Sequence, residues 1–508
     1  METSTSLDLS IPSIPSPNNE SRVQLLDIDS SPHLDEKLGF DASSQLDIDR
    51  CSSHDTLTPQ PFSVWTSIWF YLLLLAHWLA FFATFLDQFA VVLLIISIFG
   101  TASSLVYTSL YGLVVVGICF LVAPVLAGRV DVWNRSSSIS IAVIGMQLGQ
   151  IIVYISLYLI SAQSSPQSTA ASGLFALTLF GATMARSCFG MHMVVVERDW
   201  LVVICQIFIK QESSLLSIVN ANLRRIELVA KIIAPLIVSG ILSSTSRSVA
   251  ILIFGIIRIV SLFGMLLCFW GVYKRFPELA SPKQPHREIQ DASIPTVIRW
   301  YNQVKHACTT FASQKVVLTS ITTAILWMSV LTFSSQTLTY LTYKGYSSFD
   351  ISVLKSGSEV CGLLAALTMT VIIRYIGTNR SGLIGIWLHV FFLAFTMISF
   401  GISDITAAMT LFVGGLLLSR FGYWVFDLSQ SQIMQEGVLS SEAGIVNGLQ
   451  WSCIHFFEII SHVLTLIWNT PQQLYIPSII SFVGLLVAGL LFTCYYWRAT
   501  RQQVLKQV

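Results

Sequence analysis

Charged side chains are scarce in this sequence. Asp, Glu, Lys and Arg make up 11% of its 508 residues, against about 25% in a typical soluble domain. Hydrophobic residues make up 54%, and the mean hydropathy is +0.71. Because a soluble globule could not cover its surface with so few charges, the composition argues against a soluble enzyme, a nucleic-acid-binding protein and a disordered scaffold. It predicts an integral membrane protein.

Three common sequence signatures are also missing. The nine cysteines are scattered without a CxxC pair, which favours buried small apolar residues over a zinc or iron–sulfur site. The start of the chain lacks the basic and apolar stretches of a secretory signal. The apolar body holds no HExxH, GxSxG or paired-aspartate motif of an intramembrane enzyme. We therefore expect neither enzyme activity nor a cofactor.

Residues 1–62 differ sharply from the rest of the chain. They carry eleven acidic and three basic residues and are rich in Ser, Pro and Asp. Such a segment cannot bury enough apolar surface to offset the entropy cost of ordering it. We therefore predict a disordered, acidic tail.

Long apolar runs follow from Phe62 onwards. A helix that crosses a bilayer needs about 20 such residues. The candidate spans are 64–97, 101–127, 137–162, 172–196, 218–243, 248–273, 314–342, 349–374, 381–402, 405–433, 443–468 and 474–497. The fold predicted is all-α, with 12 transmembrane helices. A loop at 275–312 would separate a six-helix bundle at 63–274 from a second one at 313–498, followed by a short tail at 499–508.

The loops carry their basic residues unevenly. Those on the side of both termini hold Arg129, Arg135, Arg198, Lys210, Lys274, Arg275, Lys283, Arg287, Arg299, Lys305, Arg374 and Arg380. The opposite loops hold Arg247 and Lys344. By the positive-inside rule, both termini are predicted to be cytosolic. The plasma membrane and an internal membrane, such as that of a vacuole, both fit this pattern.

A short basic turn occurs at the same place in each predicted half. The turn after the second span reads Gly128-Arg-Val-Asp131-Val-Trp-Asn-Arg135, and the turn after the eighth reads Arg374-Tyr-Ile-Gly377-Thr-Asn-Arg380. Both resemble the turn motif of major facilitator transporters. That fold consists of two parallel six-helix repeats.

Ionisable residues lie inside the predicted spans, where hydrocarbon makes them costly. They are Asp87, Arg186, Glu227, Lys231, Arg258, Lys355, Glu359, Arg420, Asp427 and Glu458. A water-accessible pathway through the bundle accounts for so many charged groups better than inert helix packing does.

Two segments resemble the ferroportins, solute carrier family 40. The first reads Glu197-Arg198-Asp199-Trp200, then Asn220-Ala-Asn-Leu-Arg224-Arg225-Ile-Glu227. The second reads Arg420-Phe-Gly422-Tyr-Trp424-Val-Phe426-Asp427-Leu, then Gly444-Ile-Val-Asn447-Gly448. Weaker likeness covers most of residues 63–500. The resemblance implies a major facilitator that exports Fe²⁺ or a related divalent metal from the cytosol by alternating access.

The resemblance also implies one metal site in each half. In the N-terminal half, Asn220 and Glu227 match the family's fifth-span pair. The alternative for Glu227 is an ion pair with Lys231, four residues further along the helix. The family's first-span Asp falls on Thr84, and its His falls on Gln88. Asp87 either supplies the missing carboxylate or pairs with a buried basic residue such as Arg186.

In the C-terminal half, the family's metal-binding Cys falls on Ser335 and its His on Ser461. Beside Ser461, the residues His455, Glu458 and His462 share one helical face at i, i+3 and i+7. Imidazole and carboxylate groups suit Fe, Zn, Co or Mn. The alternative is a hydrogen-bonded polar seam between helices.

Charged residues near the cytosolic helix ends form a predicted gate between the halves. The set is Asp131, Arg135, Arg198, Asp199, Arg224, Arg225, Arg420 and Asp427. Ion pairs across the halves would hold one state and break in the other. The family has an Arg at the position of Ala443, so one member of the gate is missing.

The partners expected are the lipid bilayer and the divalent metal substrate, with no nucleic acid and with a monomeric protein. Vertebrate ferroportins are blocked by the peptide hepcidin through the seventh-span Cys. Because that position is Ser335, we expect no hepcidin binding. The alternatives are a receptor-like membrane protein that does not transport, or a major facilitator for another metal or a small organic cation.

Deleting residues 1–60 is expected to leave transport unchanged, because this tail cannot pack against the bundle. Flux into vesicles should be compared between the truncated and full-length chains. Loss of flux in a truncated protein that is folded and correctly sorted would contradict this prediction.

Overall fold

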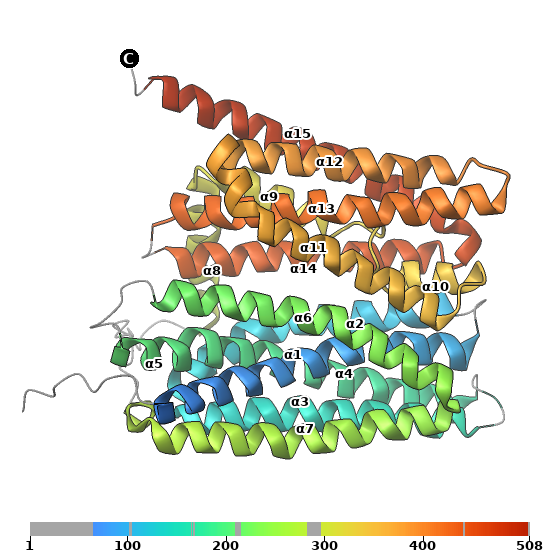
Figure 1. The fold of residues 1–508 in the computed structure, drawn as a ribbon, viewed down its shortest axis with the longest axis horizontal. Coiled ribbons are helices and arrows are strands. Elements are labelled where there is room, and N and C mark those ends of the chain that lie inside the picture. The colour runs from blue at the N-terminus through green and yellow to red at the C-terminus, as the bar shows by residue number, and fades with distance from the viewer. Residues whose placement is uncertain are drawn as a thin grey trace, which may run out of the picture. The chain divides into compact units, whose positions relative to one another are not determined.

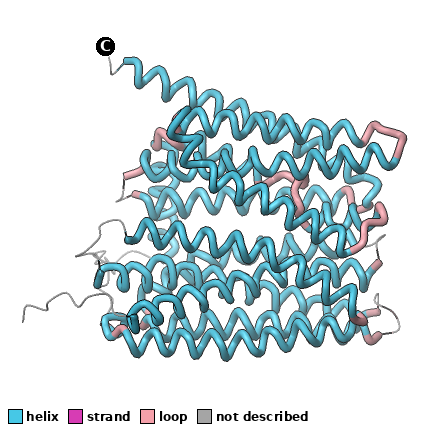
Figure 2. Tube along the Cα trace, viewed as in Figure 1, coloured by secondary structure: helices cyan, strands magenta, loops and turns pink. Residues whose placement is uncertain are grey.

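The computed structural model describes residues 64–100, 104–163, 165, 168–208, 215–281, 296–439 and 442–505. The chain divides into two units, Met1–Gln60 and Pro61–Val508. The predicted acidic tail at 1–62 lies outside the described residues. The second unit is a bundle of helices, without a β-strand in its described part (Figures 1 and 2). The all-α prediction is confirmed.

The first six predicted spans each correspond to one long helix. These are α1 (Val64–Phe99), α2 (Ser104–Val132), α3 (Arg135–Ser161), α4 (Thr169–Val195), α6 (Leu215–Ser244) and α7 (Arg247–Arg275). Shorter elements follow α4 and α7, namely η1 (Val196–Trp200), α5 (Leu201–Phe208) and η2 (Pro277–Ala280). Helix α8 (Thr296–Ser313) lies in the region predicted as a loop.

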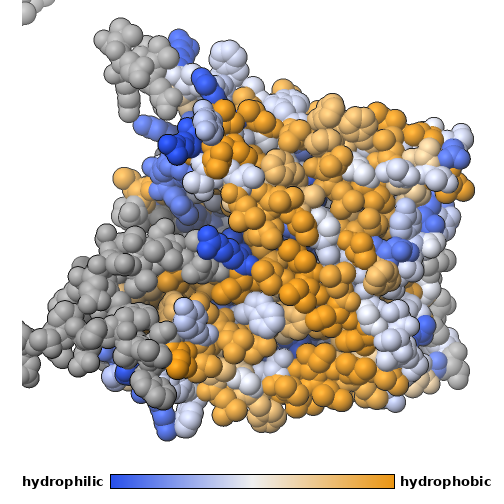
Figure 3. Space-filling view, viewed as in Figure 1, coloured by the Kyte–Doolittle hydropathy of each residue, from blue (hydrophilic) through white to orange (hydrophobic). Residues whose placement is uncertain are grey.

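The later spans form the second group of helices. They are α9 (Val317–Leu326), α10 (Ser335–Tyr343), α11 (Ser348–Ile376), α12 (Thr378–Ser399), α13 (Ile405–Gly437), α14 (Ala443–Ile467), η3 (Pro471–Leu474) and α15 (Tyr475–Leu505). Within the described ranges, nine helices are long and apolar enough to cross a membrane. Figure 3 shows apolar residues over the middle of the bundle and hydrophilic residues towards its two ends.

The seventh span is not the continuous helix predicted at 314–342. It divides into α9 and α10, with a non-helical segment at 327–334 between them. The Val330 N–H donates to Ser481 Oγ at 3.1 Å, and Thr337 Oγ1 donates to the Val330 carbonyl at 2.8 Å. Non-helical backbone is tolerated at membrane depth only where it is buried in protein and hydrogen-bonded. The side chains of Ser481 and Thr337 therefore satisfy the N–H and the carbonyl of Val330, which are not bonded within a helix.

Glycine pairs hold the third and fourth helices of each group in close contact. A Cβ added at Gly149 of α3 would lie 2.6 Å from the carbonyl oxygen of Gly181 in α4. A Cβ added at Gly422 of α13 would lie 2.7 Å from the carbonyl oxygen of Gly385 in α12. Small residues allow such close approach of backbones in membranes. The same close contact between glycines therefore occurs in both groups, as expected for a structural repeat.

Replacing Gly422 with alanine is expected to destabilise the protein by about 1–3 kcal/mol, because the new methyl group meets backbone atoms that cannot move aside. Gly414→Ala on the same helix is the matched control, since nothing lies within 4 Å of its added Cβ. Thermal unfolding of the purified proteins would measure both effects. Equal midpoints for the two variants would show that the crossing tolerates a side chain.

Candidate functional site

The two groups of helices meet mainly along two pairs, α2 with α14 and α6 with α11, and α10 also contacts α1 and α2. At the end of the bundle where α1 ends and α2 begins, hydroxyl groups join the halves. Ser109 lies 2.8 Å from Thr465, and Ser239 lies 2.6 Å from Ser352. This end lies on the right in Figure 1, and α8 lies near the opposite end.

A central charge cluster lies between the halves. It consists of Arg224, Glu227 and Lys231 of α6, Lys355 and Glu359 of α11, and Arg420 and Asp427 of α13. Six of its seven members form ion pairs with one another, as described below. Arg420 is the exception.

Glu227 lies at the centre of the α6 part of this cluster. Its Oε2 accepts a hydrogen bond from Arg224 Nη1 at 2.6 Å, and Lys231 Nζ lies 2.7 Å from its Oε1. Residues three and four positions apart are neighbours on a helix surface, so the local sequence dictates these contacts. The side chain of Glu227 is 13% exposed, and its charge is balanced from both directions along α6.

One ion pair of the cluster crosses between the halves. Arg224 Nη2 lies 3.5 Å from Asp427 Oδ2 on α13. The guanidinium of Arg224 and the amine of Lys231 also lie 5.1 and 5.2 Å from the ring centroid of Trp424. Such cation–π contacts add to the attraction between the halves. Arg224 thus contacts Glu227 in its own half and Asp427 in the other.

In the α11 and α13 parts of the cluster, some charged groups lack a hydrogen-bonded partner. Lys355 Nζ lies 3.0 Å from Glu359 Oε1, while Glu359 Oε2 is buried and has no hydrogen-bond partner among the described residues. The guanidinium of Arg420 stacks 4.3 Å from the Tyr423 ring centroid. No carboxylate in the described ranges forms an ion pair with it.

The structure distributes the predicted gate residues among several environments. Arg224 and Asp427 meet across the halves, whereas Arg135 and Asp199 pair at 2.6 Å within the N-terminal half. Arg420 makes no ion pair across the halves among the described residues. Arg198 and Arg225 are exposed. Asp131 lies in the last turn of α2, and its side chain is outside the described part.

Asp87 occupies the second of the two roles considered for it. Its carboxylate forms an ion pair with Arg258 of α7 and accepts a hydrogen bond from the Tyr154 hydroxyl of α3. All three residues are buried. Asp87 therefore pairs with a buried basic residue, and this residue is Arg258 rather than Arg186. Burial requires such pairing, because an unpaired charge inside the bundle would be costly.

Of the other residues of the predicted N-terminal metal site, the structure describes some side chains and not others. Gln88 lies on α1 with an exposed side chain. Asn220 lies on α6 beside the cluster, but its side chain is outside the described part. Glu227 is therefore the one acidic residue of this predicted site that lies at the boundary between the halves.

The face of α14 does not bring its three predicted ligands together. His455 Nδ1 donates to Glu458 Oε2 at 3.1 Å. His462 instead accepts a hydrogen bond from Gln336 Nε2 of α10 at 2.8 Å. The described residues contain no group of three His, Cys, Asp or Glu side chains positioned for a metal ion. This arrangement matches the alternative, a polar seam between helices.

A buried histidine pair was not anticipated from the sequence. His77 Nδ1 of α1 lies 3.2 Å from His192 Nε2 of α4, and His77 Nε2 lies 3.4 Å from Glu197. The only sequence signal was a histidine within each of two apolar spans. The pair fixes α1 against α4 inside the N-terminal half, away from the central charge cluster.

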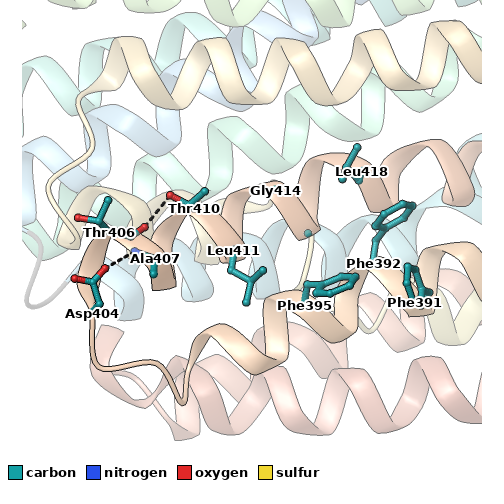
Figure 4. Close-up of a pocket in the computed structure, with 11 residues that line it drawn as sticks. Phe391, Phe392, Phe395, Asp404, Thr406, Ala407, Thr410, Leu411, Gly414 and Leu418 are labelled. Carbon is teal, nitrogen blue, oxygen red and sulfur yellow. Dashed lines mark hydrogen bonds between the residues drawn. The ribbon is translucent and has the colours of Figure 1, made fainter.

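An apolar groove lies between α12 and α13 (Figure 4). Phe391, Phe392 and Phe395 line one side, and Gly414 and Leu418 line the other. Asp404 at one end already accepts a hydrogen bond from the Ala407 N–H as the cap of α13. The groove opens within one pair of neighbouring helices and not between the halves, so we do not assign it to the pathway.

Comparison with known proteins finds relatives both by sequence and by structure. A family model described as Ferroportin1 (FPN1) matches residues 68–485. Solute carrier family 40 member 1 of Oryza sativa subsp. japonica is 26% identical over 84% of this chain and 91% of its own length. Ferroportin of Homo sapiens is 23% identical over 82% and 89%. The crystal structure of a bacterial homologue of the iron transporter ferroportin in an inward-facing state matches with a TM-score of 0.72 and 18% identity, over 85% of this chain and 99% of the other.

Proposed function

Because this chain belongs to the ferroportin family, we propose that it exports ferrous iron or a related divalent metal from the cytosol by alternating access. The names of its relatives support iron as the substrate. The observation that carries the proposal is the position of Glu227. It is a carboxylate at the boundary between the two groups of helices, held by cations that a metal ion can displace.

The geometry suggests how metal binding and gating are linked. A divalent ion at Glu227 competes with Lys231 and Arg224 for the same two oxygen atoms. Once displaced, Arg224 still has Asp427 of the other half within reach. Metal binding would then strengthen the contact between the halves at this level of the bundle. A two-state element biased by its ligand is the basis of such transport cycles.

A flux assay with purified protein in liposomes tests the proposal. Fe²⁺ under reducing conditions, Mn²⁺, Co²⁺, Ni²⁺ and Zn²⁺ would be supplied in turn, with protein-free liposomes as the control. We expect protein-dependent flux of Fe²⁺ and weaker flux of at least one other ion. A monodisperse protein that moves none of these metals would favour the receptor-like alternative.

A further inference from the structure

One carboxylate oxygen of the central charge cluster has no partner. Glu359 Oε1 lies 3.0 Å from Lys355 Nζ, whereas Oε2 is buried and makes no hydrogen bond within the described ranges. The side chain as a whole is 4% exposed. A buried charged oxygen without a donor costs free energy, so a cation that reaches it is bound strongly. Glu359 can therefore accept one more cationic donor.

Two hydrogen bonds set the register between α6 and α11. Ser239 Oγ lies 2.6 Å from Ser352 Oγ, and Ser356 Oγ donates to the Ile232 carbonyl at 2.8 Å. Because residue numbers fall along α6 as they rise along α11, the two helices run antiparallel across the boundary between the halves.

Glu359 follows the second of these bonds by three residues. Further in the same direction, Leu228 of α6 and Ala365 of α11 belong to one apolar cluster. Glu359 lies between these two contacts along α11, just as Lys231 lies between them along α6. The free oxygen of the second half is therefore level with the turn of α6 that holds Lys231.

Trp424 connects Lys231 to this turn of α11. Its ring centroid lies 5.2 Å from Lys231 Nζ. A Cβ added at Gly362 would lie 2.3 Å from Trp424 Nε1, so the other contact of the indole is with α11. Gly362 follows Glu359 by three residues and is its neighbour on the helix surface. The Lys231 amine and the turn that carries Glu359 thus contact the same indole ring.

A divalent ion bound at Glu227 would leave Lys231 without a counter-ion. Arg224 and Lys231 share this carboxylate, and Arg224 has Asp427 as a second partner. Lys231 forms no second ion pair with a carboxylate in the described part of the chain. An ammonium group left unpaired inside the bundle is costly, and this cost opposes metal binding.

We propose that Glu359 is the acceptor for Lys231 when a divalent metal binds at Glu227. This inference rests on the proposed metal transport and adds a positioning residue to it, because Glu359 acts through Lys231. Lys231 exchanges Glu227 Oε1 for Glu359 Oε2, while Arg224 keeps Asp427. Both displaced cations are then paired with the second half. Metal binding thus replaces ion pairs within one half by ion pairs between the halves.

Calorimetric titration of the purified protein with Co²⁺ tests this role. Glu359→Gln should weaken Co²⁺ binding at least about tenfold, because Lys231 then stays at Glu227. Lys231→Met removes the competing ammonium, so in that background Glu359→Gln should change the affinity less than about twofold. A purely structural role of Glu359 would weaken binding equally in both backgrounds. That result, or an unchanged affinity in the single variant, overturns the inference.

A second variant tests whether Glu359 serves only to balance Lys355. Glu359→Gln combined with Lys355→Met leaves no unbalanced charge from this pair, and it replaces the single variant if that protein does not fold. We expect the double variant to bind Co²⁺ as weakly as Glu359→Gln. Wild-type affinity in the double variant overturns the inference.

The matched control is Glu278→Gln, since Glu278 is an exposed residue of η2. This variant should bind Co²⁺ as the wild-type protein does. Negative results with the Glu359 variants overturn the inference and leave metal transport standing. A wild-type protein that neither binds Co²⁺ nor moves any metal in the flux assay contradicts the proposed function, and the inference with it.

Discussion

Replacing Glu227 with glutamine is expected to reduce metal flux more than about tenfold, because each charged hydrogen bond lost at a binding carboxylate costs about 1.5–3 kcal/mol. The substitution keeps the size of the side chain and removes only its charge. Arg224 and Lys231 then lose their shared counter-ion. On the proposed function, the metal also loses its acidic ligand. Initial rates of Fe²⁺ flux in proteoliposomes would measure the effect.

The control for this prediction is Glu278→Gln, since Glu278 is an exposed residue of η2 outside the bundle. A second variant, Glu227→Gln combined with Lys231→Gln, separates two roles for the carboxylate. If Glu227 serves only to balance Lys231, the double variant regains transport. If it binds metal, the double variant stays inactive. Wild-type flux in the single variant would place the metal elsewhere.

Replacing Arg258 with leucine is expected to destabilise the protein by about 3–5 kcal/mol, because it leaves the buried carboxylate of Asp87 without its counter-ion. Arg258 also donates to Gln147 Oε1 at 2.9 Å and to the Ala83 carbonyl at 2.7 Å, so one side chain connects α7 to α3 and α1. Chemical unfolding in detergent would measure the loss.

The double variant Asp87→Asn with Arg258→Leu should recover part of this stability, because no buried charge remains. A metal-binding role for Asp87 gives a different result. Asp87→Asn alone would then fold normally and lose transport. An Arg258→Leu protein as stable as the wild type would show that the pair contributes little to the fold.

The helices could be predicted from the sequence because lipid imposes a simple rule, a run of about 20 apolar residues for each crossing. The break between α9 and α10 could not, since the segment at 327–334 contains neither Pro nor Gly. Its backbone is satisfied by Ser481 of α15, which is distant in the sequence. A hydropathy pattern contains no information about such a contact.

For the charged residues too, contacts within one helix could be predicted from the sequence, whereas contacts between distant segments could not. The pairing of Glu227 with Lys231 follows from a local spacing of four residues, which the sequence shows directly. The partner of Asp87 had to be chosen among several basic residues on other helices. His462 belongs to the helical face of Glu458, yet Gln336 of α10 holds it. Local sequence therefore predicted which residues are polar and close along one helix, but not which helix faces them.

The glycine crossings have a mechanical consequence. Where backbone meets backbone, as at Gly149 with Gly181 and at Gly385 with Gly422, no side-chain rotamer can change to let the helices slide. Each half should therefore move as a rigid body, and the motion must be taken up at the seams between α2 and α14 and between α6 and α11. Those seams contain serine and threonine hydroxyls, which can exchange one hydrogen-bond partner for another at little cost as the halves rock.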